Sequence, residues 1–192
     1  MPEKTVQKEP GKKPAPSKKP KPQQEVVVQI SLSELHPFPD HPFQVREDAS
    51  MQETAESVKE YGVLVPALAR PREDGGYELI AGHRRKHACE LAGLATMPVI
   101  VRDIDRDAAT IIMVDSNLQR ENILPSERAK AYKMKMEAIK RQGARTDLTS
   151  PKISAKFRSD DEVGQDAGVS GDTIRNYIAL TQLVPELQQM VD

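Results

Sequence analysis

The sequence predicts an α+β N-terminal domain followed by an all-α C-terminal region. Short stretches with strand-like alternation are interleaved with stretches of helical spacing as far as about Gln119, and only helical spacing follows. Near the C-terminus, two helical stretches flank Gly168-Val169-Ser170, which is typical of a helix-turn-helix. With 38% hydrophobic residues, 4% aromatic residues and no Trp in 192 residues, we expect only a modest core.

The first 25 residues contain repeated lysines and prolines and almost nothing that a core could bury. This composition cannot offset the entropy of folding, so we expect a disordered basic tail over residues 1–25. Such a tail either solubilises the chain or binds DNA without sequence preference.

Composition also excludes several classes of protein. No apolar run approaches the ~18 residues of a membrane span, and the N-terminus has no apolar segment of the kind that secretory signals carry. The single cysteine, Cys89, excludes an internal disulfide and is compatible with a reducing compartment. We therefore expect a cytoplasmic protein with no membrane contact.

The N-terminal domain, residues 26–120, is expected to contain four strands. Apolar residues predict them over residues 26–30, 65–70, 77–81 and 97–101, with the third pairing back on the second as a hairpin. Met51, Ala55 and Val58 predict a helix that ends at Gly62. Residues 33–46 hold three prolines and are expected to be an irregular connection.

Two longer helices are expected over residues 105–120 and 126–142. The apolar stripes that should face the core are Ala108, Ile111, Val114 and Leu118 in the first helix, and Ala129, Tyr132, Met136 and Ile139 in the second. The outer face of the second helix is expected to be basic, either as a phosphate-contacting surface or as an ordinary solvated one. Its residues are Arg128, Lys130, Lys133, Lys135, Lys140, Arg141 and Arg145.

The C-terminal helical domain is placed at residues 121–192. A linker is expected over 143–151, a short helix over 152–157, and a last helix from Val184 to Val191. The helix-turn-helix is expected over 161–168 and 170–180, with Ser170 as N-cap of its second helix. Its apolar positions are Val163, Ala167, Val169, Ile174 and Ile178, and its close approaches are at Gly164 and Gly168.

The stretch YELIAGHRRKHACELAG, residues 77–93, predicts an anion site. A strand that runs through Gly82 into a helix N-terminus directs free backbone N–H groups at one spot. The cations His83 to His87 crowd onto that spot, where the helix dipole disfavours them unless an anion neutralises them. Asn117 and Arg120, three residues apart, can reach one ligand together. Polyphosphate and nucleic acid are the candidate anions, and a solvated surface is the alternative.

Three ordered boxes carry a resemblance to a known family. GVLVP at 62–66, GHRRKHA at 82–88 and SNLQRENILPSERA at 116–129, with the helix-turn-helix behind them, resemble the ParB family of DNA-partition proteins, most closely its plasmid and mobile-element variants. The resemblance covers about residues 26–192 and implies a ParB- and sulfiredoxin-like α+β fold for the first domain. It further implies a sliding clamp on DNA that CTP and Mg²⁺ control.

Carried over by motif position, the resemblance assigns nucleotide-binding roles to Gly62, Leu64, Pro66, Gly82, His83, Arg84, Arg85, Ala88, Asn117 and Arg120. Asn117 is also the implied Mg²⁺ ligand, which is chemically adequate because Mg²⁺ keeps several waters and takes few protein ligands. The DNA-contacting residues are expected to be Ser170, Gly171, Asp172, Thr173, Arg175 and Asn176.

This sequence departs from the family pattern at two positions. Ser116 stands where most relatives have Glu, and Val65 stands where they have Gln. A serine hydroxyl can touch a metal or its water, but it supplies no negative charge and is a poor general base. The sequence therefore predicts nucleotide binding and leaves CTP hydrolysis open.

The implied partners are a palindromic centromere-like duplex DNA, a second copy of the chain, and a Walker-type ParA-like ATPase that the basic tail would stimulate. Family members continue into a C-terminal dimerisation domain that is not present in this sequence, so we expect a fragment, associated with the nucleoid or a plasmid.

Two other functions remain open: a nucleotide-independent transcriptional or plasmid-copy regulator, and an enzyme. The enzyme is disfavoured because Gly82 stands where a sulfiredoxin-like site needs cysteine, and because the boxes are basic rather than acidic.

Overall fold

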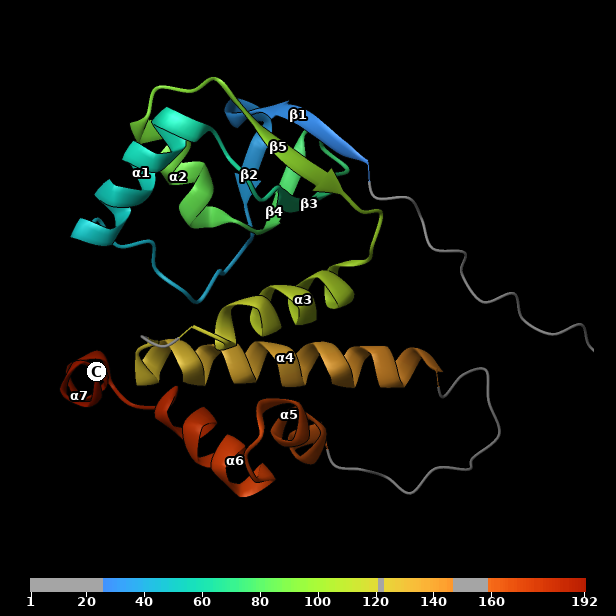
Figure 1. Ribbon diagram of the computed structural model, residues 1–192. Helices are drawn as coiled ribbons and strands as arrows, with labels where there is room; N and C mark the ends of the chain where they lie inside the picture. The colour runs from blue at the N-terminus through green and yellow to red at the C-terminus, as the bar shows by residue number, and fades with distance from the viewer. Residues whose placement is uncertain (1–25, 121–122, 147–158) are drawn as a thin grey trace, which may run out of the picture.

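The computed structural model describes residues 26–120, 123–146 and 159–192, and consists of a mixed sheet with helices at its side and a stack of helices beneath it (Figure 1). The predicted α+β domain followed by a helical region is confirmed. The expected tail 1–25, most of the expected linker and the expected helix 152–157 lie outside the described residues. In the part of the chain that the structure describes, no helix is long and apolar enough to cross a membrane.

The sheet has five strands in the order β1-β5-β3-β4-β2. β1 (Val27–Ser31) pairs antiparallel with β5 (Thr96–Val101), which lies parallel to β3 (Ala67–Pro71). β3 forms the predicted antiparallel hairpin with β4 (Tyr77–Ala81). β3 begins two residues later than predicted, so Val65 and Pro66 precede the strand.

One strand was not predicted. Residues 33–46 were expected to be irregular, yet a short 3-10 helix, η1 (Leu32–Glu34), leads into β2 (Leu35–Pro37), which pairs parallel with β4. Three residues are too few for alternation to be visible, and Pro37 is tolerated because β2 lies at the edge of the sheet. Parallel pairing with a strand about 40 residues away leaves no local signal.

Two helices cover one side of the sheet. α1 (Ala49–Tyr61) begins at Asp48, whose carboxylate accepts from the Met51 N–H, and ends at Gly62 as predicted. α2 (His83–Leu91) follows β4 through Gly82. The buried side chains of this first core come from both helices and from the strands: Ile30, Leu35, Met51, Val58, Ala67, Ala69, Leu79, Ala88, Cys89, Met97 and Val99.

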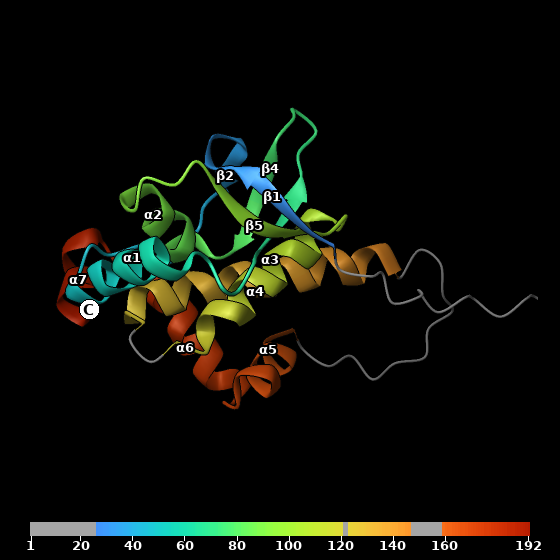
Figure 2. The same ribbon diagram turned by 45° about the horizontal axis from the view of Figure 1, so that its top comes forward.

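α3 (Arg106–Leu118) lies between the sheet and α4 (Pro125–Thr146), as Figures 1 and 2 both show. The predicted stripe is only partly correct, because Ala109, Thr110, Met113 and Val114 are the buried apolar and hydroxyl residues while Ala108 and Ile111 are half-buried. α3 is apolar around most of its circumference, so periodicity could not select the face that packing against two neighbours buries.

α4 differs from its prediction in two ways. It continues to Thr146, so the expected linker is wrong for residues 143–146. Lys135, predicted on the outer basic face, is 1% exposed. The predicted core residues Ala129 and Tyr132 are buried, and Met136 and Ile139 pack against the core formed with the C-terminal helices.

α5 (Ser159–Ala167) and α6 (Gly171–Leu180) pack on α4, and α7 (Pro185–Val191) ends the chain. Ser170 caps α6 as predicted, accepting from the Thr173 N–H. Gly164 allows the turn between α5 and α6 to pack closely on α5, since a Cβ at Gly164 would lie 2.6 Å from the carbonyl oxygen of Val169. Val169, predicted to be a core position, is instead exposed, whereas Val163 and Ile174 are buried against Tyr132.

Candidate functional site

A cavity of about 220 Å³ lies where α2 begins and α3 ends. Its wall contains six of the ten residues expected to bind nucleotide, which are Gly82, His83, Arg84, Arg85, Asn117 and Arg120, and it also contains Ser116. The lining residues are His41, Phe43, Val45, Ala81, Gly82, His83, Arg84, Arg85, Ser116, Asn117 and Arg120. The two boxes that are about 30 residues apart in the sequence therefore meet at one place.

The N-terminus of α2 forms the floor of this cavity. Gly82 has a φ of 109°, and a Cβ there would lie 2.8 Å from the Ala67 Cβ, so only glycine fits between strand and helix. The first turn of α2 directs its backbone N–H groups out of the helix end, where an anion can accept from them.

Arg84 and Arg120 bring positive charge to the cavity from two sides. The Arg84 Nη2 donates to the Ser50 Oγ at 3.2 Å and lies 3.7 Å from an Asp48 oxygen. The Arg120 Nη1 donates to the Asn117 Oδ1 at 3.4 Å. Burial and the neighbouring Arg84 lower the pKa of Arg120, which indicates that the two guanidinium groups lie within each other's field.

A second cavity of about 360 Å³ adjoins the first and shares Arg84 and Arg120 with it. It is lined further by Gln44, Arg46, Asp48, Ser50, Ile123 and Glu127. Together the two cavities reach the size range of small-molecule sites in proteins.

Arg85 is held by the first box. Its Nη1 donates to the carbonyl oxygens of Val65 and Pro66, each at 2.6 Å. These bonds join the 62–66 loop to α2, and burial lowers the pKa of the Arg85 guanidinium. Gly62 and Leu64 line a neighbouring cavity of about 370 Å³, to which Arg85 also contributes. Arg85 therefore positions the loop, and it lines both this cavity and the first one.

Ala88 does not line any of these cavities among the described residues. It is fully buried in the first core beside Cys89 and packs against the sheet. The small side chain allows α2 to approach the sheet, so its place in the box has a packing reason, and its expected nucleotide contact stays a prediction.

The connection between β2 and α1 contributes residues that sequence reasoning missed. His41, Phe43 and Val45 line the cavity, although their segment was expected to be an irregular loop. The available signal was Phe38 and Phe43, two aromatic residues in a proline-rich stretch that a solvated loop has no reason to carry, and both are buried.

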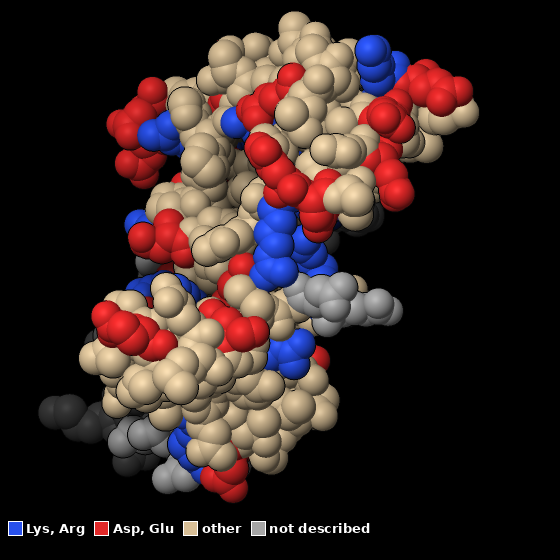
Figure 3. All heavy atoms as spheres, turned by 90° about the vertical axis from the view of Figure 1, so that its left-hand side faces the viewer, with Lys and Arg blue, Asp and Glu red and all other residues tan. Residues whose placement is uncertain are grey.

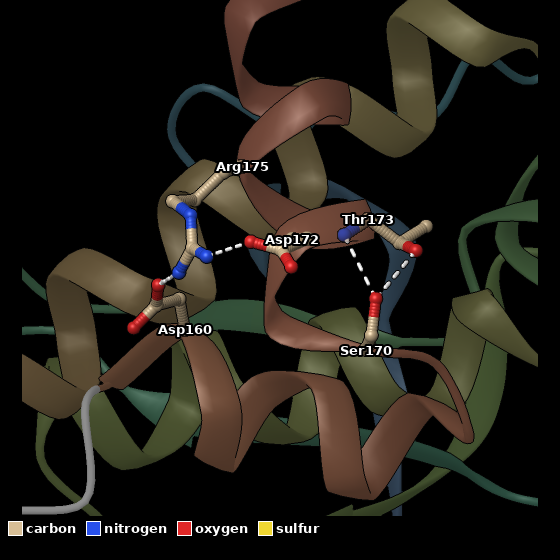
Figure 4. Close-up of polar contacts among 5 residues, drawn as sticks. All are labelled: Asp160, Ser170, Asp172, Thr173 and Arg175. Carbon is tan, nitrogen blue, oxygen red and sulfur yellow. Dashed lines mark hydrogen bonds and ion pairs between the residues drawn. The ribbon is translucent and has the colours of Figure 1, made fainter.

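α6 presents only part of its expected DNA-contacting set. Ser170, Asp172, Arg175 and Asn176 are exposed and Thr173 is partly so, whereas Gly171 is buried against Asp161 of α5. Figure 4 shows the Arg175 guanidinium bonded to both Asp160 and Asp172. Gly171 thus belongs to the packing between α5 and α6, and Arg175 is engaged by carboxylates.

Charge is unevenly distributed over the face seen in Figure 3. Lys and Arg side chains gather between the upper and the lower part of the molecule, with Asp and Glu side chains above them.

Within the described ranges, no group of three or more His, Cys, Asp or Glu side chains is arranged to hold a metal ion. A metal ion at the cavity would therefore be held by an oxygen such as the Asn117 Oδ1 and by oxygens of the anion bound there.

Comparisons with known proteins agree with this architecture. The family model described as the ParB N-terminal domain matches residues 16–118, more than half of the chain. Chromosome-partitioning protein Spo0J of Thermus thermophilus is 35% identical over 167 residues, covering 86% of this chain and 55% of that protein. Stage 0 sporulation protein J of Bacillus subtilis is 32% identical over 168 residues, covering 88% of this chain and 53% of that protein.

Among solved structures, the C-terminally truncated chromosome-partitioning protein ParB from Caulobacter crescentus, complexed to the centromeric parS site, is 27% identical with a TM-score of 0.54. That match covers 84% of this chain and 75% of that one. The chain spans about half the length of the curated relatives that it matches. The match to the family model, which extends over all five strands and both of the first two boxes, shows that the chain belongs to the ParB family.

Proposed function

We propose that this chain is the nucleotide- and DNA-binding part of a partition protein, and that it binds CTP with Mg²⁺ at the cavity between α2 and α3. The observation that carries the proposal is the convergence of Arg84, Arg120 and Asn117 on one cavity at a helix N-terminus. Two guanidinium groups beside a helix N-terminus repel each other and the positive end of the helix dipole, and a bound anion would neutralise them more fully than the nearby Asp48 and Glu127 do.

In this proposal the triphosphate lies over the first turn of α2. Backbone N–H groups after Gly82 would donate to phosphate oxygens, and Arg84 and Arg120 would neutralise their charge. The 62–66 loop, which Arg85 ties to α2, would form the wall near the base. The preference for cytosine rests on the resemblance of the three boxes to the ParB family.

Asn117 fits the role of a metal ligand. Its Nδ2 donates to the Met113 carbonyl oxygen at 2.8 Å, which fixes the amide so that Oδ1 is directed to the cavity side, toward Arg120. The Asn117 Oδ1 would hold Mg²⁺, which would supply neutralisation of phosphate charge.

Ser116 favours binding over fast hydrolysis. Its Oγ donates to the Met113 carbonyl oxygen at 2.9 Å, so the hydroxyl proton is engaged within the helix. A hydroxyl in this state offers lone pairs but no negative charge, and it cannot act as an efficient general base.

The exposed first turn of α6 supports a role in DNA binding. In a helix-turn-helix the second helix enters the major groove with its N-terminal residues toward the bases. Ser170, Asp172, Thr173 and Asn176 are accessible in this position, and Arg175 would exchange its carboxylate partners for phosphate. Palindromic recognition, clamp closure in a homodimer and stimulation of a ParA-like ATPase by residues 1–25 belong to the same proposal.

Equilibrium dialysis with each labelled nucleoside triphosphate and Mg²⁺, with and without cognate DNA, tests the nucleotide site. We expect CTP to be retained preferentially, and Arg84→Ala to reduce retention at least tenfold because it removes a charge-assisted contact of about 1.5–3 kcal/mol. Arg72→Ala is the control, since Arg72 pairs with the exposed Asp74 in the β3–β4 turn outside the cavity. No retention under any condition would support the nucleotide-independent regulator instead.

A further inference from the structure

Two histidines face each other at the nucleotide cavity and leave polar atoms without partners. The rings of His41 and His83 lie 3.9 Å apart between centroids, tilted by 46°. Both line the cavity of about 220 Å³. Among the described residues, their Nε2 atoms are the buried side-chain nitrogen and oxygen atoms that have no hydrogen-bond partner. A buried polar atom without a partner is costly, so this arrangement calls for a ligand or a proton.

The hydrogen bond of the other His41 nitrogen determines where the lone pair lies. The His41 Nδ1 is 2.7 Å from the Phe43 carbonyl oxygen, and a carbonyl can only accept. Nδ1 must therefore carry the proton, and Nε2 of the neutral ring presents a lone pair. In this state His41 cannot donate to a phosphate oxygen, whereas protonation of Nε2 would create such a donor without breaking the bond to Phe43.

While the cavity holds no anion, the charged groups around the two histidines disfavour protonation of either ring. Arg120 at the end of α3 faces both rings, and Lys86 of α2 faces His83. Arg84 and Arg85 line the same cavity, and Glu127 of α4 is the acidic group that acts on His41 in the opposite sense. Burial is the largest cause of the lowered pKa of both imidazoles, and together with His41, Lys86 and Arg120 it brings the pKa of His83 to about 3.

We propose that His41 and His83 form a proton-binding element of the phosphate site. When a polyphosphate occupies the cavity, one proton from solvent binds to the Nε2 atom of His41, and the resulting imidazolium donates to a phosphate oxygen. No other bond is made or broken. The inference rests on the proposed function, and it adds His41, from a segment outside the three boxes, to the residues that hold the nucleotide.

The sign of the pH dependence follows from the charges. A polyphosphate reverses the local field, so the pair has a higher pKa with nucleotide bound than without it. Binding therefore takes up protons, and affinity rises as pH falls through the bound-state pKa, by at most about tenfold per pH unit. Above the bound-state pKa the pair stays neutral in both states and affinity no longer depends on it.

Calorimetry of CTP with Mg²⁺ binding to the full chain tests the inference. Titrations at the same pH in two buffers that both have capacity there, repeated from pH 6 to 8, give the number of protons taken up, because the paired buffers are chosen to have different ionisation enthalpies. We expect the wild type to take up more protons than His41→Phe, which keeps the ring contact with His83 but cannot be protonated. His36→Phe is the matched control, since His36 lies on the edge strand β2 outside the cavity.

Proton uptake and pH dependence that are equal in wild type and His41→Phe would overturn the inference while leaving nucleotide binding established. Absence of CTP binding at every pH would overturn the inference together with the proposed function. A measurement that needs no variant gives a second readout: the imidazole C–H resonances of the wild type, followed by NMR against pH. We expect one of the two rings to titrate at least one pH unit higher with CTP and Mg²⁺ than without, and identical titration curves would contradict the proposal.

Discussion

At the scale of the residue, Gly82 is the position where backbone and site depend on each other most directly. Its φ of 109° is disfavoured for other residues, and a Cβ would lie 2.8 Å from the Ala67 Cβ. Both problems arise at the junction that directs the α2 N-terminus into the cavity. Strain here therefore affects stability and the candidate phosphate site together.

We expect Gly82→Ala to lower the free energy of unfolding by about 1–3 kcal/mol, because the left-handed backbone and the close approach to Ala67 both disfavour a side chain. Urea denaturation of both proteins measures the difference. Gly143→Ala is the control: Gly143 lies within helix α4 with nothing near its Cβ position, so alanine there should stabilise by up to about 1 kcal/mol. An unchanged free energy of unfolding in Gly82→Ala would show that β4 and α2 can move apart without loss of stability.

His83 makes stability depend on pH in a predictable direction. Burial, followed by His41 and nearby cations, lowers its pKa from 6.5 to about 3 in the folded protein. The unfolded chain binds a proton near pH 6.5 and the folded chain does not, so stability is fully present above pH 6.5 and is lost as pH falls toward 3. The loss is about 1.4 kcal/mol per pH unit.

Chemical denaturation of wild type and His83→Gln from pH 8 to pH 4.5 isolates this contribution from that of the carboxylates. We expect the difference in the free energy of unfolding between the two proteins to change by about 2–3 kcal/mol over that range, in favour of the variant at acid pH. If the free energy of unfolding of wild type and of His83→Gln changed in parallel with pH, His83 would not be held neutral by its surroundings.

At the scale of the element, Lys135 joins three helices. Its Nζ donates to Asp115 of α3 at 2.6 Å and to Asp166 of α5 at 2.9 Å, while the side chain itself is 1% exposed. Burial alone would lower the pKa of Lys135, but its bonds to the two aspartates outweigh burial and raise it. The ammonium is therefore charged, and it holds α5 to the end of α3 that carries Asn117.

We expect Lys135→Ala to destabilise by about 2–4 kcal/mol, since it removes the ion pairs and leaves a cavity. Lys135→Met should lower the free energy of unfolding by less than half as much. Methionine keeps most of the side-chain volume, and the two aspartates are about half exposed and can be rehydrated. Urea denaturation of both variants separates charge from packing. Equal losses in both variants would assign the whole effect to the ion pairs.

At the scale of the whole molecule, α3 connects the sheet to the C-terminal helices. Met113 and Val114 of α3 share a core with Ile80 of β4 and Ala131 of α4. Leu118, at the end of α3, packs against this core and also against the core of α4, α5 and α6. The candidate nucleotide site and the candidate DNA-binding helices are thus linked through continuous packing.

We therefore expect CTP with Mg²⁺ to stabilise the chain as one unit. Ligand at a hundredfold its Kd adds about 2.7 kcal/mol, which should raise Tm by roughly 5–10 °C in a single transition. Differential scanning calorimetry measures the shift, and Arg84→Ala should reduce it to about half or less at the same ligand concentration. Two transitions, of which nucleotide moves only one, would show that the sheet and the C-terminal helices unfold independently.

Local chemistry made much of this protein predictable. Alternation followed by glycine and a cationic helix start identified β4, Gly82 and α2, and Ser170 identified the start of α6. The spacing of Asn117 and Arg120 also indicated a shared target, and both residues line the cavity with Arg84. Each of these features depends on residues within a few positions of one another, where backbone preferences and capping act.

Only the tertiary structure decided the rest. The pairing of β2 with β4, the buried face of α3 and the burial of Lys135 each depend on a partner that is distant in the sequence. So do the bonds of Arg85 to the 62–66 loop and the approach of His41 to His83. Which of several apolar or charged faces becomes buried is determined by the neighbour it meets, because packing and ion pairing act across space and leave no periodicity along the chain.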